Sequence, residues 1–227
     1  DGPSCPFEDR VKSTMRAANA AADKTGKKAM VAFNLTGETD EMRRRHDLVR
    51  DCGGTCVMVN LTGVGMSGMI DIGRHTEMPI HAHRAGWGAL TRDPLLGWSY
   101  PAWSKLWRLA GADHMHVNGF DNKFTESNES VAASVASLKD PLFGNSPMCA
   151  VPVFSSGQTV RQAAATLNAA GSPDVLVTAG GGIIAHPDGV TEGVKAMRQA
   201  YDAAMQGVDV DVYAKEYHEL TAALAAF

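Results

Sequence analysis

The chain has 227 residues, of which 44% are hydrophobic and 20% are charged. Such a chain can bury an ordinary core as one large globular domain, which excludes disordered and fibrous proteins. A net charge of -4 and a pI near 6.1 leave no basic surface for nucleic acid, and no apolar run approaches the roughly 18 residues of a membrane span. The first residues also lack the basic and apolar pattern of a signal peptide, so we expect a soluble, cytoplasmic protein.

The first quarter of the chain predicts two helices that alternate with two strands. The spacing of apolar residues favours a helix over Pro6–Gly26 and a second helix from Glu38 to about Asp51. Short apolar runs favour buried strands at Ala29–Gly37 and Thr55–Gly63, and both runs end in Asn-Leu-Thr-Gly. We interpret this repetition as an internal echo of a unit in which a strand is followed by a helix.

The middle of the chain is less regular. The segment from Gly65 to about Gly73 is rich in glycine and methionine, which predicts a weak helix or a mobile loop. A strand at Met78–Gly86 follows, and a long connection over Gly86–Ser99 leads to a helix at Tyr100–Ala110. We expect this helix to pack its two tryptophans inward.

The rest of the sequence continues the alternation of strands and helices. Its predicted segments are a strand at Ala112–Gly119, a polar loop at Asn118–Asn128, a helix at Glu129–Lys139, a loop at Asp140–Pro147, a strand at Met148–Gly157, a helix at Thr159–Ala170, a strand at Asp174–Gly182, and helices at Thr191–Gln206 and Val210–Ala226. The whole chain therefore predicts six strands, each followed by a helix.

This alternation determines the expected fold class. Strands that are separated by helices pair in parallel, because each helical crossover returns the chain to the same end of the sheet. We predict an α/β fold, and the spacing suits a TIM (β/α)8 barrel, with a doubly wound open sheet as the alternative. Because such a barrel has eight strands, we expect this chain to be the C-terminal part of a longer protein, whose first two barrel strands lie upstream.

Polar side chains and glycines gather at the predicted strand ends, which meet at one face of a parallel sheet. They are Asn34, Asn60, His81, His83, Arg84, His114, His116, Ser155, Ser156 and Gly180–Gly182. Two His-x-His pairs on neighbouring strands would suit zinc. A zinc hydrolase of this kind also needs an acidic residue at the end of the last strand, where this chain has glycines, so the sequence disfavours that alternative.

Two anion-binding groups are a better interpretation of these strand ends. Gly180–Gly182 exposes successive backbone N–H groups, although glycine runs also simply make turns. Arg84, His116 and Ser155 all carry hydrogen-bond donors, although each could equally serve the structure. Two such pockets would fit an extended sugar-like substrate with a phosphate or carboxylate at each end. Lys123, in the polar loop, is either part of this site or a solvated surface lysine.

Several motifs together resemble the C-terminal barrel of the RuBisCO large chain, and more closely its RuBisCO-like relatives. The resemblance runs from about Pro6 to the final helix. The matching segments are Leu61-Thr-Gly63, His81-Ala-His-Arg-Ala85, Gly111-Ala-Asp-His-Met-His116 with Lys123 beyond it, Pro152-Val-Phe-Ser155 and Gly180-Gly-Gly-Ile-Ile-Ala-His-Pro187. The resemblance implies a TIM barrel with an N-terminal α+β domain upstream.

The resemblance also implies roles for individual residues. Carried over by position, Arg84, His116 and Ser155 form one phosphate site, and Gly157, Gly180 and Gly181 form the other. The catalytic residues are His83, beside the metal, and Lys123, on a mobile loop that closes over the substrate.

No metal ligand is expected within this chain. The family's Mg²⁺ site consists of a carbamylated lysine, an aspartate and a glutamate, and these residues would fall upstream of Asp1. We therefore expect the 227 residues alone to be inactive.

The resemblance implies a Mg²⁺-dependent enzyme that enolises a sugar-derived keto substrate. Retention of Lys123 favours a decarboxylase or a transcarboxylase/hydrolase of a 3-oxo sugar acid or its phosphate. The alternatives are a ribulose-bisphosphate carboxylase, an enolase or isomerase of the methionine-salvage type, and a non-catalytic sugar-phosphate-binding relative. Trp87 and Ser156 stand where a carboxylase has histidine and glycine. The family's sites form between two subunits, so a homodimer is implied.

Overall fold

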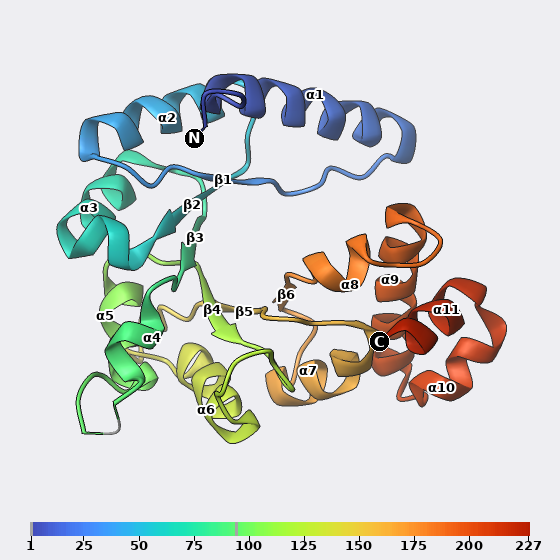
Figure 1. Ribbon diagram of the computed structural model, residues 1–227. Coiled ribbons are helices and arrows are strands. Elements are labelled where there is room, and N and C mark those ends of the chain that lie inside the picture. Colours follow the sequence, from blue (N-terminus) through green and yellow to red (C-terminus); the bar gives the residue numbers. More distant parts are fainter. Residues whose placement is uncertain (1, 94) are drawn as a thin grey trace. The chain divides into compact units, whose positions relative to one another are not determined.

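The computed structural model describes residues 2–93 and 95–227, in which strands and helices alternate (Figure 1). Asp1, and Pro94 in the predicted connection after the third strand, lie outside the described residues. The strands are β1 (Ala32–Asn34), β2 (Cys56–Asn60), β3 (Ile80–His83), β4 (His114–Asn118), β5 (Val151–Phe154) and β6 (Leu176–Val177). The predicted α/β class is confirmed.

The six strands follow one another in the sheet in their sequence order, β1 to β6. The pairs β1–β2, β2–β3, β3–β4 and β5–β6 are parallel. A doubly wound sheet reverses its strand order at a switch point, whereas the strands of a barrel follow one another around it. The observed order therefore matches six consecutive units of a (β/α)8 barrel.

Most of the helices fall close to their predicted positions, but one of them forms within Gly86–Ser99, which was predicted as a long connection. They are α1 (Phe7–Thr25), α2 (Thr39–Asp51), α3 (Leu61–His75), α4 (Trp87–Thr91), α5 (Tyr100–Leu109), α6 (Asn128–Lys139), η1 (Val160–Gln162), α7 (Ala163–Ala170), α8 (Gly180–Ile184), α9 (Val190–Gln206), α10 (Val210–Tyr213), η2 (Ala214–Glu216) and α11 (His218–Ala226). Trp103 and Trp107 on α5 are buried, as expected.

The helix α3 spans 15 residues where the composition predicts only a short, weak helix or a mobile loop. It begins directly after β2, and only Gly65, with φ 66°, interrupts its helical backbone. Leu61, Met69 and Ile72 are fully buried along it. Their burial offsets the poor helix propensity of its glycines, because most helical stability in proteins comes from tertiary packing.

Two other predicted elements differ in the structure. The expected single helix over Val210–Ala226 is divided into α10, η2 and α11, because Tyr217 is extended (φ -133°, ψ 111°) and stacks on Tyr213 at 4.9 Å. This break turns α11 so that Leu220 and Leu224 can be buried. The segment Gly180–Gly182, predicted as a strand end, instead begins the short helix α8.

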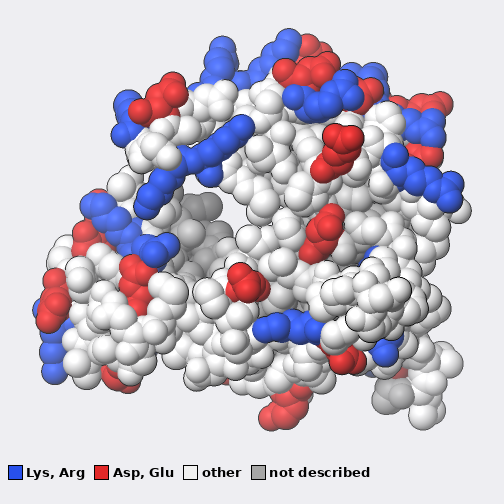
Figure 2. Space-filling view, turned by 180° about the vertical axis from the view of Figure 1, so that it is seen from behind, with Lys and Arg blue, Asp and Glu red and all other residues white. Residues whose placement is uncertain are grey.

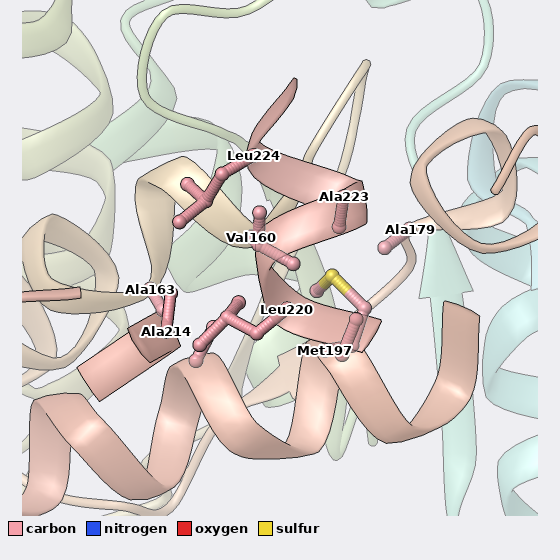
Figure 3. Close-up of a cluster of buried hydrophobic side chains, with 10 residues drawn as sticks. Val160, Ala163, Ala179, Met197, Ala214, Leu220, Ala223 and Leu224 are labelled. Carbon is pink, nitrogen blue, oxygen red and sulfur yellow. The ribbon is translucent and has the colours of Figure 1, made fainter. Parts of the chain in front are cut away.

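The chain divides into two compact units, residues 1–115 and residues 116–227, with the boundary inside β4. In the first unit, α1, α2 and α3 bury residues such as Phe7, Met42 and Met69. The second unit has a core in which η1, α7, α9, η2 and α11 interdigitate (Figure 3). Small residues dominate that core, which lets the helices approach closely. Gly193 of α9 shows this, since a Cβ there would lie 2.3 Å from the Ile183 carbonyl oxygen.

On the face shown in Figure 2, Lys and Arg side chains are interspersed with Asp and Glu side chains. Within residues 2–93 and 95–227, no helix combines the length and apolar character needed to cross a membrane.

Candidate active site

In the first unit, β1 and β2 end in asparagines that share one polar network. Asn34 Oδ1 accepts hydrogen bonds from the Thr36 hydroxyl at 2.6 Å and the Thr36 N–H at 3.0 Å. The Thr36 hydroxyl oxygen in turn accepts from the Asn60 N–H at 2.8 Å. Asn60 Oδ1 is buried and has no hydrogen-bond partner among the described residues. The repeated Asn-Leu-Thr-Gly segment therefore joins two strand ends and presents one buried amide oxygen.

His83, at the end of β3, has a defined tautomer. Its Nδ1 accepts a hydrogen bond from the Ala85 N–H at 3.0 Å, so the proton of the neutral ring is on Nε2. Burial, with a smaller effect of the neighbouring Arg84 charge, lowers the pKa of His83. Both facts favour a neutral imidazole that donates through Nε2–H, which suits stabilisation of a developing oxyanion better than removal of a proton.

Arg84 lies beside an aromatic cluster. Its guanidinium lies 5.4 Å from the ring centre of Tyr100, a cation–π contact. Trp87 packs against Tyr100 at 5.6 Å and against Trp103 at 4.7 Å. Trp87 therefore serves aromatic packing in this chain.

A mostly apolar hollow of about 320 Å³ lies in the first unit, beside the start of α3. It is lined by Leu61, Thr62, Gly65, Met66, Leu90, Trp98, Trp103, Leu106 and Trp107. Such a lining does not suit a sugar phosphate, so we place no substrate in it.

His81 and His114 form a buried pair on neighbouring strands. The two residues are in register between β3 and β4, and their rings meet edge to face at 5.9 Å. Burial, followed by the neighbouring imidazoles of His114 and His83, lowers the pKa of His81 to about 4. Burial also lowers the pKa of His114. These histidines are neutral parts of the sheet near pH 7.

In the second unit, the loop after β4 lies against the turn after β5. The Lys123 N–H donates to the Ser156 carbonyl oxygen at 3.0 Å. A Cβ placed on Gly157 would lie 3.6 Å from the Lys123 Cβ, an ordinary contact distance. The side chain of Lys123 is exposed and its Nζ lies 5.5 Å from the centre of the Phe124 ring. The structure thus brings together two residues that the sequence assigns to the site.

A buried glutamine that the sequence analysis missed holds these loops in place. Gln158 is 1% exposed, and its Nε2 donates to the Phe120 carbonyl oxygen at 3.1 Å. A Cβ on Gly119 would lie 2.1 Å from that Nε2 and 2.5 Å from the Ser155 carbonyl oxygen. The glycine is therefore required for the approach of the two loops. The juxtaposed Gly119 and Gln158 carry no local signal, because they meet only in the folded chain.

The base of the Lys123 loop is fixed by its own side chains. Asn118 has a left-handed backbone (φ 74°), and its Nδ2 donates to Glu126 Oε2 at 2.9 Å. The Ser130 hydroxyl donates to Glu126 Oε1 at 2.9 Å. Asn118 and Glu126 therefore fix the two ends of this loop, and Lys123 between these two residues is exposed.

Ser155 lies directly after β5, where its N–H donates to the Asn118 carbonyl oxygen at 3.0 Å. Its hydroxyl lies 3.3 Å from the Ser156 hydroxyl. His116 is buried within β4. Arg84 belongs to the first unit, whereas His116 and Ser155 belong to the second. The grouping of these three residues into one phosphate pocket stays a prediction.

The three residues of the glycine run differ in exposure. Gly180 and Gly181 are exposed, and none of the other residues that the structure describes would contact a Cβ at either position. Gly182 is buried, and a Cβ there would lie 2.7 Å from the Gln158 carbonyl oxygen. The first two glycines are open to a ligand, and the third seats α8 against the turn after β5.

Replacing Ser156 with glycine is expected to raise the free energy of unfolding by up to about 1 kcal/mol. Ser156 has a left-handed backbone (φ 70°), which strains a residue that carries a side chain. Urea unfolding would measure the change. Ser13→Gly, in the exposed middle of α1, is the matched control and should lower stability by about 0.5 kcal/mol. A destabilised Ser156→Gly protein would contradict the expectation.

Comparison with known proteins places these features in a family. A profile described as the ribulose bisphosphate carboxylase large chain, catalytic domain, matches residues 1–227. The 3-oxo-isoapionate-4-phosphate transcarboxylase/hydrolase of Xanthobacter autotrophicus is 58% identical over 224 residues, which cover 99% of this chain and 54% of that protein. The 3-oxo-isoapionate-4-phosphate decarboxylase of Rhizobium etli is 40% identical, over 98% of this chain and 54% of that protein. The chain spans about half the length of the curated relatives it matches.

Solved structures agree with the sequence matches. A rubisco-like protein from Burkholderia fungorum has a TM-score of 0.96 at 42% identity, covering 100% of this chain and 56% of its own. A dimeric archaeal Rubisco from Hyperthermus butylicus has a TM-score of 0.87 at 32% identity, with coverage of 100% and 56%. Both similarities extend over the whole chain, so the order of its strands and helices is that of these proteins.

Proposed function

The chain belongs to the RuBisCO large-chain family, and we propose that the intact protein is a decarboxylase or transcarboxylase/hydrolase of a 3-oxo sugar acid phosphate. The observation that carries the proposal is the position of Lys123, which the turn at Ser156 and Gly157 holds beside a strand end. An exposed cation on a loop with a fixed base suits a substrate whose carboxylate leaves or arrives.

The chemistry requires stabilisation of negative charge. When a 3-oxo acid loses CO2, the bond between C1 and C2 breaks and its electron pair forms the enolate, whose charge lies on the C3 oxygen. Donors that are preorganised at that oxygen lower the barrier. We assign this role to His83 through Nε2–H, because its Nδ1 already accepts from Ala85 and its lowered pKa keeps the ring neutral. The proton that C2 then takes up comes from another group or from water.

Lys123 is assigned to the carboxylate. Its ammonium group would orient the substrate carboxylate for cleavage and, in the transfer reaction, would pair with the carboxylate that forms on the acceptor. Gly157, Gly180 and Gly181 are assigned to a phosphate, since backbone N–H groups at such positions bind anions. We assign Arg84, His116 and Ser155 to the second anionic end of the substrate.

Mg²⁺ is part of the proposal for the intact protein, as in the family generally. The last residues of β1, β2 and β3 are Asn34, Asn60 and His83, so these strand ends provide no carboxylate. Because Mg²⁺ prefers oxygen ligands that include carboxylates, these residues by themselves do not fit a magnesium site. We propose that the ligands of Mg²⁺ come from residues other than these strand ends.

The alternatives differ in what the strand ends must supply. A ribulose-bisphosphate carboxylase has histidine and glycine where this chain has Trp87 and Ser156, and Trp87 is engaged in aromatic packing. That observation disfavours carboxylation. An enolase or isomerase of the methionine-salvage type would have no carboxylate for Lys123 to bind. A non-catalytic sugar-phosphate binder would keep the anion sites without turnover.

We also propose that the protein is cytoplasmic and works as a homodimer with its site at the subunit interface.

The test is an assay of the intact protein with 3-oxo-isoapionate 4-phosphate, bicarbonate and Mg²⁺. We expect CO2 or a carboxylated product to form, and chelation by EDTA should reduce the rate by at least about 100-fold, because metal ions stabilise the developing charge. Re-addition of Mg²⁺ should restore the rate. Binding of the substrate without turnover in the presence of Mg²⁺ would instead support the non-catalytic alternative.

A further inference from the structure

A second group of ligand-type side chains lies where α2 and α3 pack side by side (Figure 1). It consists of His46 and Asp47 on α2 and His75 at the end of α3. The helix α3 starts at the carboxyl end of β2 and leads back to the start of β3. His75 therefore lies at the amino ends of the strands, whereas the proposed active site lies at their carboxyl ends. We propose that these three residues bind a divalent ion of the zinc class that ties α2 to α3.

The distances support a shared ion. Asp47 Oδ1 lies 3.1 Å from His46 Nδ1 and 3.0 Å from His75 Nε2. One ligand atom from each residue lies within 4.8 Å of the others. Ligands bound at about 2.0–2.1 Å in a tetrahedral site lie about 3.3 Å apart, so two of the three distances between ligand atoms already nearly match. A rotation of the exposed His75 ring would bring its ligand atom to the same distance from His46 Nδ1.

His46 is already oriented as a ligand. Its side chain is 3% exposed, and its Nε2 lies 2.9 Å from the Thr76 hydroxyl. Thr76 is held in turn, because its hydroxyl oxygen accepts from the Met78 N–H at 2.9 Å. Histidines that bind metals usually use their second nitrogen in such a contact, which fixes the ring. Nδ1 of His46 therefore faces Asp47 before any ion arrives.

Arg50 is the competitor for Asp47. Its Nη1 donates to Asp47 Oδ1 at 3.0 Å, but its Nε and Nη2 also donate to Asp51 Oδ1 at 3.1 Å and 3.0 Å. The guanidinium would keep a carboxylate partner if Asp47 turned to a metal. In addition, His75 is the last residue of α3, and the carboxyl end of a helix attracts cations.

The donor set indicates the class of ion. Two imidazoles and one carboxylate suit Zn²⁺ or Co²⁺ and leave a fourth position for water. Mg²⁺ prefers oxygen ligands, so it would not compete strongly here. A zinc-class ion can thus be distinguished experimentally from the magnesium of the proposed active site.

The test is a titration of the intact protein with Co²⁺ in excess Mg²⁺, followed by visible absorption. We expect one equivalent to bind with tetrahedral bands that Zn²⁺ removes. His75→Ala and Asp47→Asn should each weaken binding at least about tenfold, and Arg50→Gln should strengthen it. His218→Ala, which removes an exposed histidine paired with Asp188 in the second unit, should leave the affinity unchanged.

A second measurement separates binding from folding. Zn²⁺ should raise the Tm of the protein and of its His218→Ala variant, and should raise the Tm of Asp47→Asn much less. Absence of a one-equivalent Co²⁺ site in the intact protein would overturn the proposal. So would Co²⁺ affinity in Asp47→Asn or His75→Ala within twofold of the unsubstituted protein.

Discussion

Replacing Lys123 with methionine is expected to lower kcat of the intact protein by at least about 100-fold, with a smaller change in KM. Methionine keeps most of the length of the side chain but removes its charge. The exposed ammonium group at this position is the proposed partner of the substrate carboxylate, and the loop that carries it is anchored by backbone and side-chain contacts that the substitution leaves intact. The variant should therefore fold and bind substrate while losing turnover.

Initial rates over a range of substrate concentrations would separate the two constants. Lys215→Met is the matched control, because Lys215 is an exposed lysine on η2 of the same unit and has no proposed role. A Lys123→Met protein that keeps more than half of its kcat would exclude Lys123 from the chemistry. A loss confined to KM would assign Lys123 to substrate binding alone.

Acidification is expected to cost the protein on the order of 2 kcal/mol of stability through His81 alone as the pH falls from 7 to 4.5. Burial beside His114 and His83 lowers the pKa of His81 from 6.5 to about 4. In this pH range the unfolded chain takes up a proton on His81, whereas the folded chain resists it. The free energy of unfolding is therefore unaffected by this group above about pH 6.5 and decreases as the pH falls towards 4. His114, whose pKa is also lowered, acts in the same direction.

Guanidinium unfolding of two variants at pH 7 and pH 4.5 would isolate this effect from that of the carboxylates. His81→Gln should lose on the order of 2 kcal/mol less stability than the unsubstituted protein over this interval, whatever its stability at pH 7. His218→Gln is the control, since the His218 side chain is 82% exposed. Equal losses in His81→Gln and the unsubstituted protein would show that His81 is protonated in both states or in neither.

Local patterns were sufficient for the fold class and for the positions of some candidate residues on strands and loops. Strict alternation of apolar runs and helical spacing predicted six parallel strands, and the described part of the chain has a sheet of six strands. The placement of His83 at a strand end and of Lys123 in a polar loop also agrees with the structure. These features depend on the order of residues along the chain, which periodicity and turn residues report directly.

Tertiary packing decided the features that local patterns missed or misplaced. Burial of Met69 and Ile72 stabilises α3, although the glycines in this segment lower its helix propensity. The glycine run becomes helical because Gly182 seats against Gln158, and the last predicted helix breaks at Tyr217.

Tertiary packing also explains why one group of histidines can be recognised in the sequence and the other cannot. His81 and His83 were visible in the sequence because they end one strand, and the His-x-His pattern drew attention to zinc. The cluster of His46, Asp47 and His75 has no sequence motif, since His75 lies on a different helix from the other two. The sequence by itself determined the number and order of the strands and placed His83 near the end of one of them. Only the packing of α2 on α3, and of the loop after β4 on the turn after β5, decided which distant residues meet.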